Sequence, residues 1–222
     1  MITALACLAT FDGVVAQNRP KELDKAEAKY KESRNKAEEM LEQAFDTAKT
    51  QINKLKNVEL PDRLKMLDII KAEKERFQQS RKIPWSIMMR PALTQYLRTI
   101  KTAELELERV YAPLVEKAIK QSRNKEAEKL REDYSRLVDK ERCVAVWRHR
   151  GGQNIQFLAN GHIDQVDSKA TWSLEGNILT MRWQTPGAPG GAWIDMCEIS
   201  QDGSIYKGKN QKGHKITGEY VP

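Results

Sequence analysis

The sequence predicts a two-part α+β protein, with helical hairpins or a coiled coil first and a small antiparallel β domain after them. The distribution of glycine supports this division, because none of the 12 glycines lies between Gly13 and Gly151. An interior glycine costs a helix roughly 1 kcal/mol, so this region, rich in Lys, Glu, Ala, Leu and Arg, favours uninterrupted helices. After Gly151 the chain changes to short β-branched and aromatic runs separated by glycine-containing turns, which is typical of hairpins. We therefore expect residues 18–142 to be helical and residues 143–222 to form the β domain.

Composition excludes several classes of protein. The 222 residues are 40% hydrophobic, 31% charged and 7% aromatic, and the mean hydropathy is −0.68. A chain of this length can bury a sizeable core. It is too polar for a protein with several membrane spans, and its three cysteines are too few for a fold that depends on many disulfides.

The first 17 residues have the character of an export signal. Residues 2–16 are mostly apolar, and the small residues before Gln17 fit a cleavage site, although no Lys or Arg precedes them and Asp12 interrupts the run. We expect residues 1–17 to be a signal-peptide remnant, and hence a periplasmic, cell-surface or secreted protein. The alternative is an N-terminal strand or helix that packs on the body. The run is too short for a transmembrane helix, and no transmembrane span is expected.

Prolines divide the helical region into expected elements. The first helix is predicted from Pro20 to about Lys56 and the second from Pro61, because proline is tolerated in the first turn of a helix. The segment 82–91 contains two prolines and is expected to be a connector. A third helix follows it, and Pro113 is predicted to kink that helix unless it lies at a helix start.

The third and fourth expected helices have the alternating three- and four-residue apolar spacing of coiled coils. The residues are Tyr96, Ile100, Ala103, Leu107, Val110 and Leu114 in the third, and Ala127, Leu130, Tyr134 and Leu137 in the fourth. We expect two helical hairpins, arranged either as a four-helix bundle or as an extended stalk. The narrow apolar seams also predict a homo-oligomer that forms through the helical region.

The net charge of +7 comes from the helical region. Residues 18–142 hold 30 Lys or Arg against 23 Asp or Glu, whereas residues 143–222 hold 8 against 7. Charges of both signs alternate along the helices, which is typical of a solvated face with ion pairs four residues apart. This pattern makes nucleic acid or another anionic polymer a less favoured partner.

The β domain divides into eight expected strands separated by short turns. They are Val144–Arg150, Asn154–Ala159, His162–Val166, Ala170–Leu174, Ile178–Trp183, Ala192–Ile199, Ser204–Lys207 and Lys215–Val221. Turns this short permit only antiparallel neighbours, so the strands should form an up-and-down meander. Such a meander closes into a small barrel or curls into a sandwich. An eight-stranded barrel has either a filled interior or one cavity for a small ligand.

Several motifs carry a resemblance. The runs Val146–His149, Ile155–Ile163 and Leu179–Trp183 resemble a lipocalin-like β domain found at the C-terminus of exported, uncharacterised bacterial proteins. Lys71–Phe77 resembles the paired-helix, coiled-coil segments of the same proteins. The resemblance covers roughly residues 20–222 and implies a fold, but it implies no catalytic, cofactor or ligand residue.

Four tryptophans of the β domain are the candidate ligand-binding residues. They are Trp193, Trp172, Trp183 and Trp147. Aromatic side chains on a β surface can hold a sugar ring or a small apolar molecule. The alternative is that each one fills the barrel core, with its indole N–H satisfied by a backbone carbonyl. Trp193 lies beside a Pro/Gly loop and is expected to be the most exposed.

Catalytic and metal motifs are lacking in the sequence. The three histidines are too far apart for a zinc spacing, and no GxSxG, P-loop or GxGxxG motif occurs. We expect a protein that is not an enzyme and needs no metal or cofactor. The favoured function is a helical stalk presenting a ligand-binding β domain, and the alternative is a purely structural, oligomerising coiled-coil scaffold.

Two cysteines lie in the β domain, and two states are open to them. Cys143 starts the first expected strand and Cys197 lies in a late one. If closure of a barrel made these strands neighbours, an exported protein could hold a disulfide between them. The alternative is a pair of separate thiols that pack as small hydrophobes.

Overall fold

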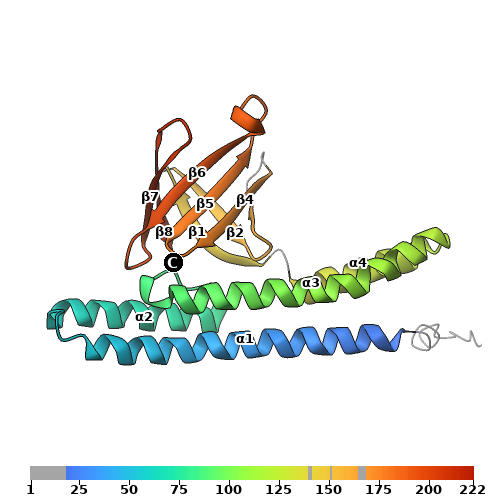
Figure 1. The fold of residues 1–222 in the computed structure, drawn as a ribbon, viewed down its shortest axis with the longest axis horizontal. Helices are drawn as coiled ribbons and strands as arrows, with labels where there is room; N and C mark the ends of the chain where they lie inside the picture. Colours follow the sequence, from blue (N-terminus) through green and yellow to red (C-terminus); the bar gives the residue numbers. More distant parts are fainter. Residues whose placement is uncertain (1–18, 140–141, 151, 165–168) are drawn as a thin grey trace, which may run out of the picture.

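A computed structural model of the chain describes residues 19–139, 142–150, 152–164 and 169–222. Four helices lie in an elongated layer, and an eight-stranded antiparallel barrel stands on one face of it (Figure 1). This confirms the α+β division and selects the barrel over the sandwich. Residues 1–17, where an export signal is expected, lie outside the described residues.

The helical layer is built around one long helix. Helix α1 (Lys21–Lys54) runs the length of the layer, and α2 (Leu60–Ser80) returns along one half of it. Helix α3 (Arg90–Lys120) packs along the other half, and α4 (Asn124–Val138) returns along α3. The α2 helix and the α3–α4 hairpin thus lie along different halves of α1, and the four helices do not form a compact four-helix bundle.

Two prolines lie in the first turns of helices, Pro61 as expected and Pro91 where the sequence predicts a connector, and a third lies inside a helix. Pro61 and Pro91 occupy the first turns of α2 and α3, where a backbone N–H would have no intrahelical acceptor. Helix α3 is nevertheless continuous through Pro113. The missing N–H of Pro113 removes one hydrogen bond from a helix that is held on both sides by α1 and α4.

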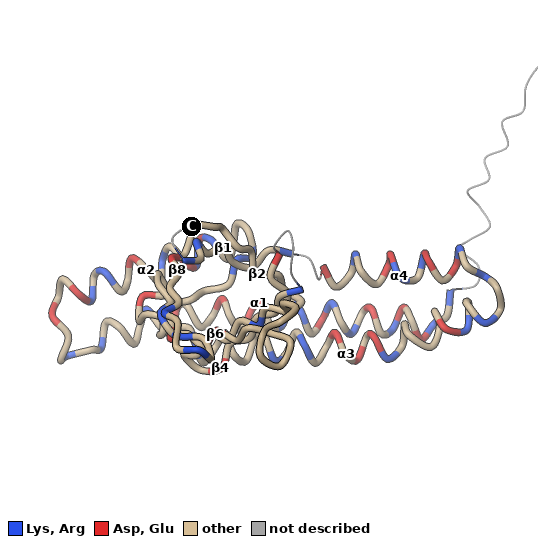
Figure 2. Tube along the Cα trace, turned by 90° about the horizontal axis from the view of Figure 1, so that it is seen from above, with Lys and Arg blue, Asp and Glu red and all other residues tan. Residues whose placement is uncertain are grey.

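The apolar stripes of the helices are buried, and the charges lie outside them. Leu23 and Tyr30 of α1 pack with Leu107 and Tyr111 of α3 and with Val138 of α4. Figure 2 shows basic and acidic residues interspersed along the helices. Ion pairs join neighbouring helices, for example Lys29 to Glu106 at 2.9 Å and Lys74 to Asp46 at 2.7 Å.

The barrel is a meander in which each strand pairs with the next and the last pairs with the first. Its strands are β1 (Cys143–His149), β2 (Gln153–Leu158), β3 (His162–Asp164), β4 (Ala170–Glu175), β5 (Ile178–Gln184), β6 (Ala192–Ile199), β7 (Ile205–Asn210) and β8 (Lys215–Val221). Closure runs from the Val146–Val221 pair to the His149–Gly218 pair. A short 3-10 helix, η3 (Pro189–Gly191), precedes β6.

Trp85 closes the helix-facing end of the barrel. It lies in the connector between α2 and α3, just before a short 3-10 helix, η2 (Ile87–Met89). The indole is 2% exposed and meets Trp147 edge-on, with the ring centroids 5.2 Å apart. The connector also bonds to the barrel backbone: Ile83 N–H donates to the Val144 carbonyl at 3.1 Å, and Ile87 N–H donates to that of Gln201 at 2.8 Å.

Two buried charged residues hold this connector in place. The Glu73 carboxylate on α2 accepts hydrogen bonds from the backbone N–H groups of Trp85 and Ser86, at 2.5 and 2.7 Å. Arg90 donates from Nε to the Trp85 carbonyl at 2.9 Å and from Nη1 to Oδ1 of Asn177 in the barrel at 3.0 Å. Burial raises the pKa of Glu73 and lowers that of Arg90 to about 10. Helices and barrel therefore share one core.

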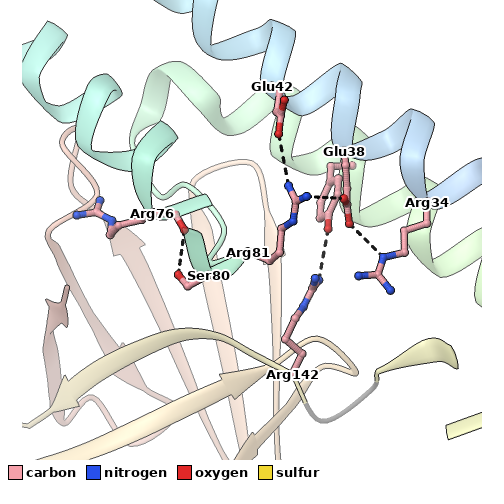
Figure 3. A network of polar contacts seen from close by, with 8 residues as sticks. Arg34, Glu38, Glu42, Arg76, Ser80, Arg81 and Arg142 are labelled. Atoms are coloured by element: carbon pink, nitrogen blue, oxygen red, sulfur yellow. Dashed lines mark hydrogen bonds and ion pairs between the residues drawn. The ribbon is translucent and has the colours of Figure 1, made fainter. Parts of the chain in front are cut away.

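A second polar network lies where α1, the end of α2 and the start of the barrel meet. Arg81, at the C-cap of α2, pairs with Glu38 at 3.3 Å and with Glu42 at 3.4 Å, and Arg34 pairs with Glu38 at 3.1 Å (Figure 3). Arg142, one residue before β1, donates from Nη2 to the Tyr96 hydroxyl on α3 at 3.4 Å, beside these ion pairs. These contacts join three parts of the chain that are distant in sequence.

Candidate functional site

The end of the barrel away from the helices holds a cavity of about 460 Å³. The connector bonds to Val144 on β1 and to Gln201 after β6, so His149 and Trp193, at the other ends of those strands, belong to the opposite mouth. The cavity walls include His149, Arg150, Gln153, Trp183, Thr185 and Trp193. The mouth is thus formed by the outer ends of β1, β2, β5 and β6.

The four candidate tryptophans separate into two groups. Trp147 and Trp172 are 0% and 7% exposed and pack against Trp85, and the Trp172 indole N–H donates to the Leu158 carbonyl at 2.9 Å. These two have the geometry of core residues. Trp183, 9% exposed, and Trp193, half-buried, lie opposite each other on paired strands and line the cavity.

The interior below the mouth is filled with side chains. Trp147, Phe157, Met181 and Tyr206 are each 0% exposed. The Tyr206 ring has room because residue 218 on β8 is glycine: a Cβ there would lie 2.2 Å from its Cζ. A ligand can therefore be held at the mouth but not in a deep central channel.

His149 is a neutral aromatic wall of the cavity. Its Nδ1 lies 2.6 Å from the Tyr206 hydroxyl, and its ring centroid lies 5.2 Å from that of Trp183. Burial, with a further contribution from the charge of Arg150, lowers the pKa of His149 to about 4. Burial also raises the pKa of Tyr206, so the phenol stays protonated and the geometry suits its O–H donating to an uncharged imidazole.

A carboxylate and a guanidinium meet at the edge of the mouth. Asp195 on β6 is 0% exposed, and its Oδ2 accepts a hydrogen bond from the Trp183 indole N–H at 2.8 Å. Its Oδ1 lies 3.8 Å from Nη2 of Arg150, whose side chain is 53% exposed. Burial raises the pKa of Asp195, while the Trp183 hydrogen bond and the charge of Arg150 oppose this rise. The hydrogen bond from its indole N–H to Asp195 fixes the orientation of the Trp183 ring.

Trp193 is held from the side of the β7–β8 loop. Gln211 accepts a hydrogen bond from Ile194 N–H at 2.7 Å and donates to the Ala192 carbonyl at 2.8 Å, so it braces the backbone on both sides of the tryptophan. The Lys212 ammonium lies 4.9 Å from the centroid of the Trp193 ring, a cation–π contact. The ring position is thus set before any ligand arrives.

Sequence reasoning missed Arg150, Gln153 and Thr185 as members of the mouth. Each lies at or just beyond a strand end, where the sequence shows only a polar turn residue. The alternation of β5 could have indicated the mouth, because Trp183 faces inward and is the second-last residue of that strand.

The two cysteines are separate thiols. Cys143 on β1 is half-buried, Cys197 on β6 is buried, and both are free. Closure brings β8 next to β1, whereas β6 pairs with β5 and β7, so the disulfide considered from the sequence does not form. Burial raises the pKa of Cys197 to about 12, which keeps it a neutral, unreactive thiol.

The part of the chain that the structure describes contains neither a metal-binding cluster nor a membrane-spanning helix. Within it, no cluster of three or more His, Cys, Asp or Glu side chains is placed to hold a metal ion. Among its helices, none combines the length and apolar character needed to cross a membrane.

The mouth therefore offers aromatic faces together with hydrogen-bonding groups of both kinds. Trp183 and Trp193 supply the faces, and Arg150, Gln153 and Thr185 supply polar atoms. Such a combination recognises a polar, ring-shaped molecule better than a purely apolar one. Comparison with known proteins provides no further assignment: no protein-family model, curated protein or solved structure matches this chain.

Proposed function

We propose that this chain is an exported, non-enzymatic binding protein whose helical layer carries a β-barrel that binds a sugar at its open mouth. One observation carries the proposal: Trp183 and Trp193 share a cavity with polar side chains, at the end of the barrel that Trp85 does not close. A sugar ring has an apolar C–H face and a rim of hydroxyls, so it needs both kinds of group.

The size of the cavity and the filled interior of the barrel favour a sugar over an apolar molecule. Its volume of about 460 Å³ lies within the range of roughly 300–1,000 Å³ usual for small-molecule sites. The other ligand considered, a small apolar molecule, would need a hollow apolar interior, and that space is occupied by Trp147, Phe157 and Tyr206.

The proposal also includes export of the protein and a lipocalin-like character of its β domain. A closed eight-stranded antiparallel barrel is compatible with a lipocalin-like domain. An exported protein meets extracellular or cell-envelope saccharides, so the expected leader and the proposed ligand are consistent with one another.

The test is a glycan array followed by NMR titration of the full chain with the sugars that are retained. We expect the indole N–H signals of Trp183 and Trp193 to shift, while those of the buried Trp85 and Trp147 stay in place. Trp193→Ala should weaken binding by about tenfold or more, because stacking and a buried face are lost.

Met196→Ala is the matched control. Met196 lies three residues from Trp193 on the same strand, is 58% exposed and is not part of the cavity. This variant should bind as the wild type does. Retention of no glycan by the wild type, or equal loss in both variants, would contradict the proposal.

A second function, that of an oligomerising scaffold, is favoured by one observation. Met40 on α1 and Leu105 and Ile119 on α3 are large apolar side chains that are 44–46% exposed on the helical layer. They suit weak self-association of the helices, which does not compete with a ligand at the far end of the barrel.

A further inference from the structure

We propose that the sugar bound at the mouth is acidic, and that Arg150 binds its carboxylate. This inference rests on the proposed function, because it specifies the chemical class of the ligand for the same cavity. It would apply to any sugar ring that carries a carboxylate, such as a uronic acid.

The charge on the cavity wall is the first argument. Among the described residues that line the cavity, Arg150 is the one that carries a full charge, and none is Asp or Glu. His149 is neutral at physiological pH. The nearby carboxylate of Asp195 is 0% exposed, so a ligand entering the mouth meets the guanidinium and not the acid.

The placement of Arg150 is the second argument. Its backbone has a φ of 49°, the left-handed region, and its N–H donates to the Thr217 carbonyl on β8 at 2.8 Å. A non-glycine residue rarely adopts this conformation. Here it turns the chain at the end of β1 and brings the side chain to the cavity wall.

The partner of Arg150 is the third argument. One guanidinium nitrogen lies 3.8 Å from Oδ1 of Asp195, which is longer than a hydrogen bond, and the side chain remains 53% exposed. Asp195 therefore orients Arg150 without enclosing it and acts as a positioning residue. A guanidinium has five N–H donors in a planar fork that matches a carboxylate, so a second carboxylate can bind along another edge.

Lys212 adds positive charge beside the aromatic wall. Its ammonium lies over one face of the Trp193 ring, 4.9 Å from the ring centroid, so a sugar ring would stack on the other face. A ligand with a negative charge would therefore be attracted from two sides, by Arg150 and by Lys212. A neutral sugar would gain only the stacking and the hydroxyl contacts.

The test compares two probes that differ in one group: methyl glucuronide, which has a carboxylate, and methyl glucoside, which has a hydroxymethyl in its place. Kd for each is measured by NMR titration of the full chain at low and high salt. We expect the wild type to prefer the glucuronide by about tenfold at low salt, the effect of one charge-assisted pair. The preference should shrink as salt screens it.

Arg150→Gln should remove most of the preference, leaving only the smaller contribution of Lys212, while glucoside binding is retained. Arg148→Gln is the matched control: Arg148 lies on β1, two residues before Arg150, is 52% exposed, and also has an acidic partner, Glu219, at 3.8 Å, but it is not part of the cavity. This variant should keep the wild-type preference.

The outcomes separate the two proposals. Equal binding of both probes by the wild type would overturn the acidic ligand and leave sugar binding in place. Equal loss of the preference in Arg148→Gln and Arg150→Gln would assign it to overall charge and also overturn the role of Arg150. Binding of neither probe would overturn both proposals.

Discussion

Replacing Trp85 with alanine is expected to destabilise the helices and the barrel together. Trp85 belongs to the connector between two helices, yet its ring lies in the barrel, 5.2 to 6.0 Å by centroid from Trp147, Trp172 and Phe157. Glu73 and Arg90 hold its backbone in place. The substitution would leave an opening at the junction of the two parts.

The size of the effect follows from two opposing contributions. A tryptophan buries about 200 Å² and each Å² stabilises by about 25 cal/mol, which amounts to about 5 kcal/mol. The Trp85 indole N–H meets no acceptor among the described residues, and such a buried group costs about 1–3 kcal/mol. We therefore expect Trp85→Ala to lower the free energy of unfolding by about 3 kcal/mol, at the low end of the usual range for this change.

Two further variants make the explanation specific. Trp85→Phe keeps an aromatic ring and removes the N–H that lacks an acceptor, so it should change stability by no more than about 1 kcal/mol. Trp193→Ala, at the open mouth, removes a half-buried ring and should cost less than Trp85→Ala.

The assay is urea unfolding, followed by far-ultraviolet circular dichroism for the helices and by near-ultraviolet circular dichroism for the packed aromatic core. Both signals should show one common transition that moves to lower urea in Trp85→Ala. A loss of less than about 1 kcal/mol would refute the packing argument. A shift confined to the near-ultraviolet signal would refute the claim that helices and barrel share one core.

Three other predictions concern backbone space, pH and association. Gly203→Ala should destabilise more than Gly213→Ala in the same assay: both positions have φ near +80°, but only at Gly203 would a Cβ lie 2.4 Å from the Trp85 backbone, and equal losses would contradict this. Because the folded pKa of His149 is lowered to about 4, the wild type should lose stability relative to His149→Gln as pH falls from 6.5 toward 4, and parallel pH profiles would refute this. Sedimentation equilibrium should detect weak self-association through residues 18–142, and a strict monomer at high concentration would count against it.

Much of the fold was predictable because its determinants are local. A helix needs a long stretch without glycine, and a strand needs alternating side chains bounded by turn residues, so both patterns can be recognised within ten to twenty residues. For this reason the expected strand Ala192–Ile199 matches β6 in both bounds, and helix α2 begins within one residue of Pro61.

The candidate site was only partly predictable because four tryptophans of similar sequence context have different environments. Alternation shows which face of a strand a side chain takes, but it does not show how far along the barrel that side chain lies. Trp172 and Trp183 both face inward, yet one packs against Trp85 and the other lines the mouth. Their separation depends on strand register, which is a property of the closed sheet.

The sequence by itself determined the order and type of the elements, the division near residue 142 and the inward pattern of the strands. Only the tertiary structure decided that a connector tryptophan fills one end of the barrel, that β8 and not β6 lies beside β1, and that Arg150 meets Asp195 at the other end. The physical reason is distance along the chain. Residues 45 to 87 positions apart come together through closure and packing, and no local preference of the backbone encodes which of them will meet.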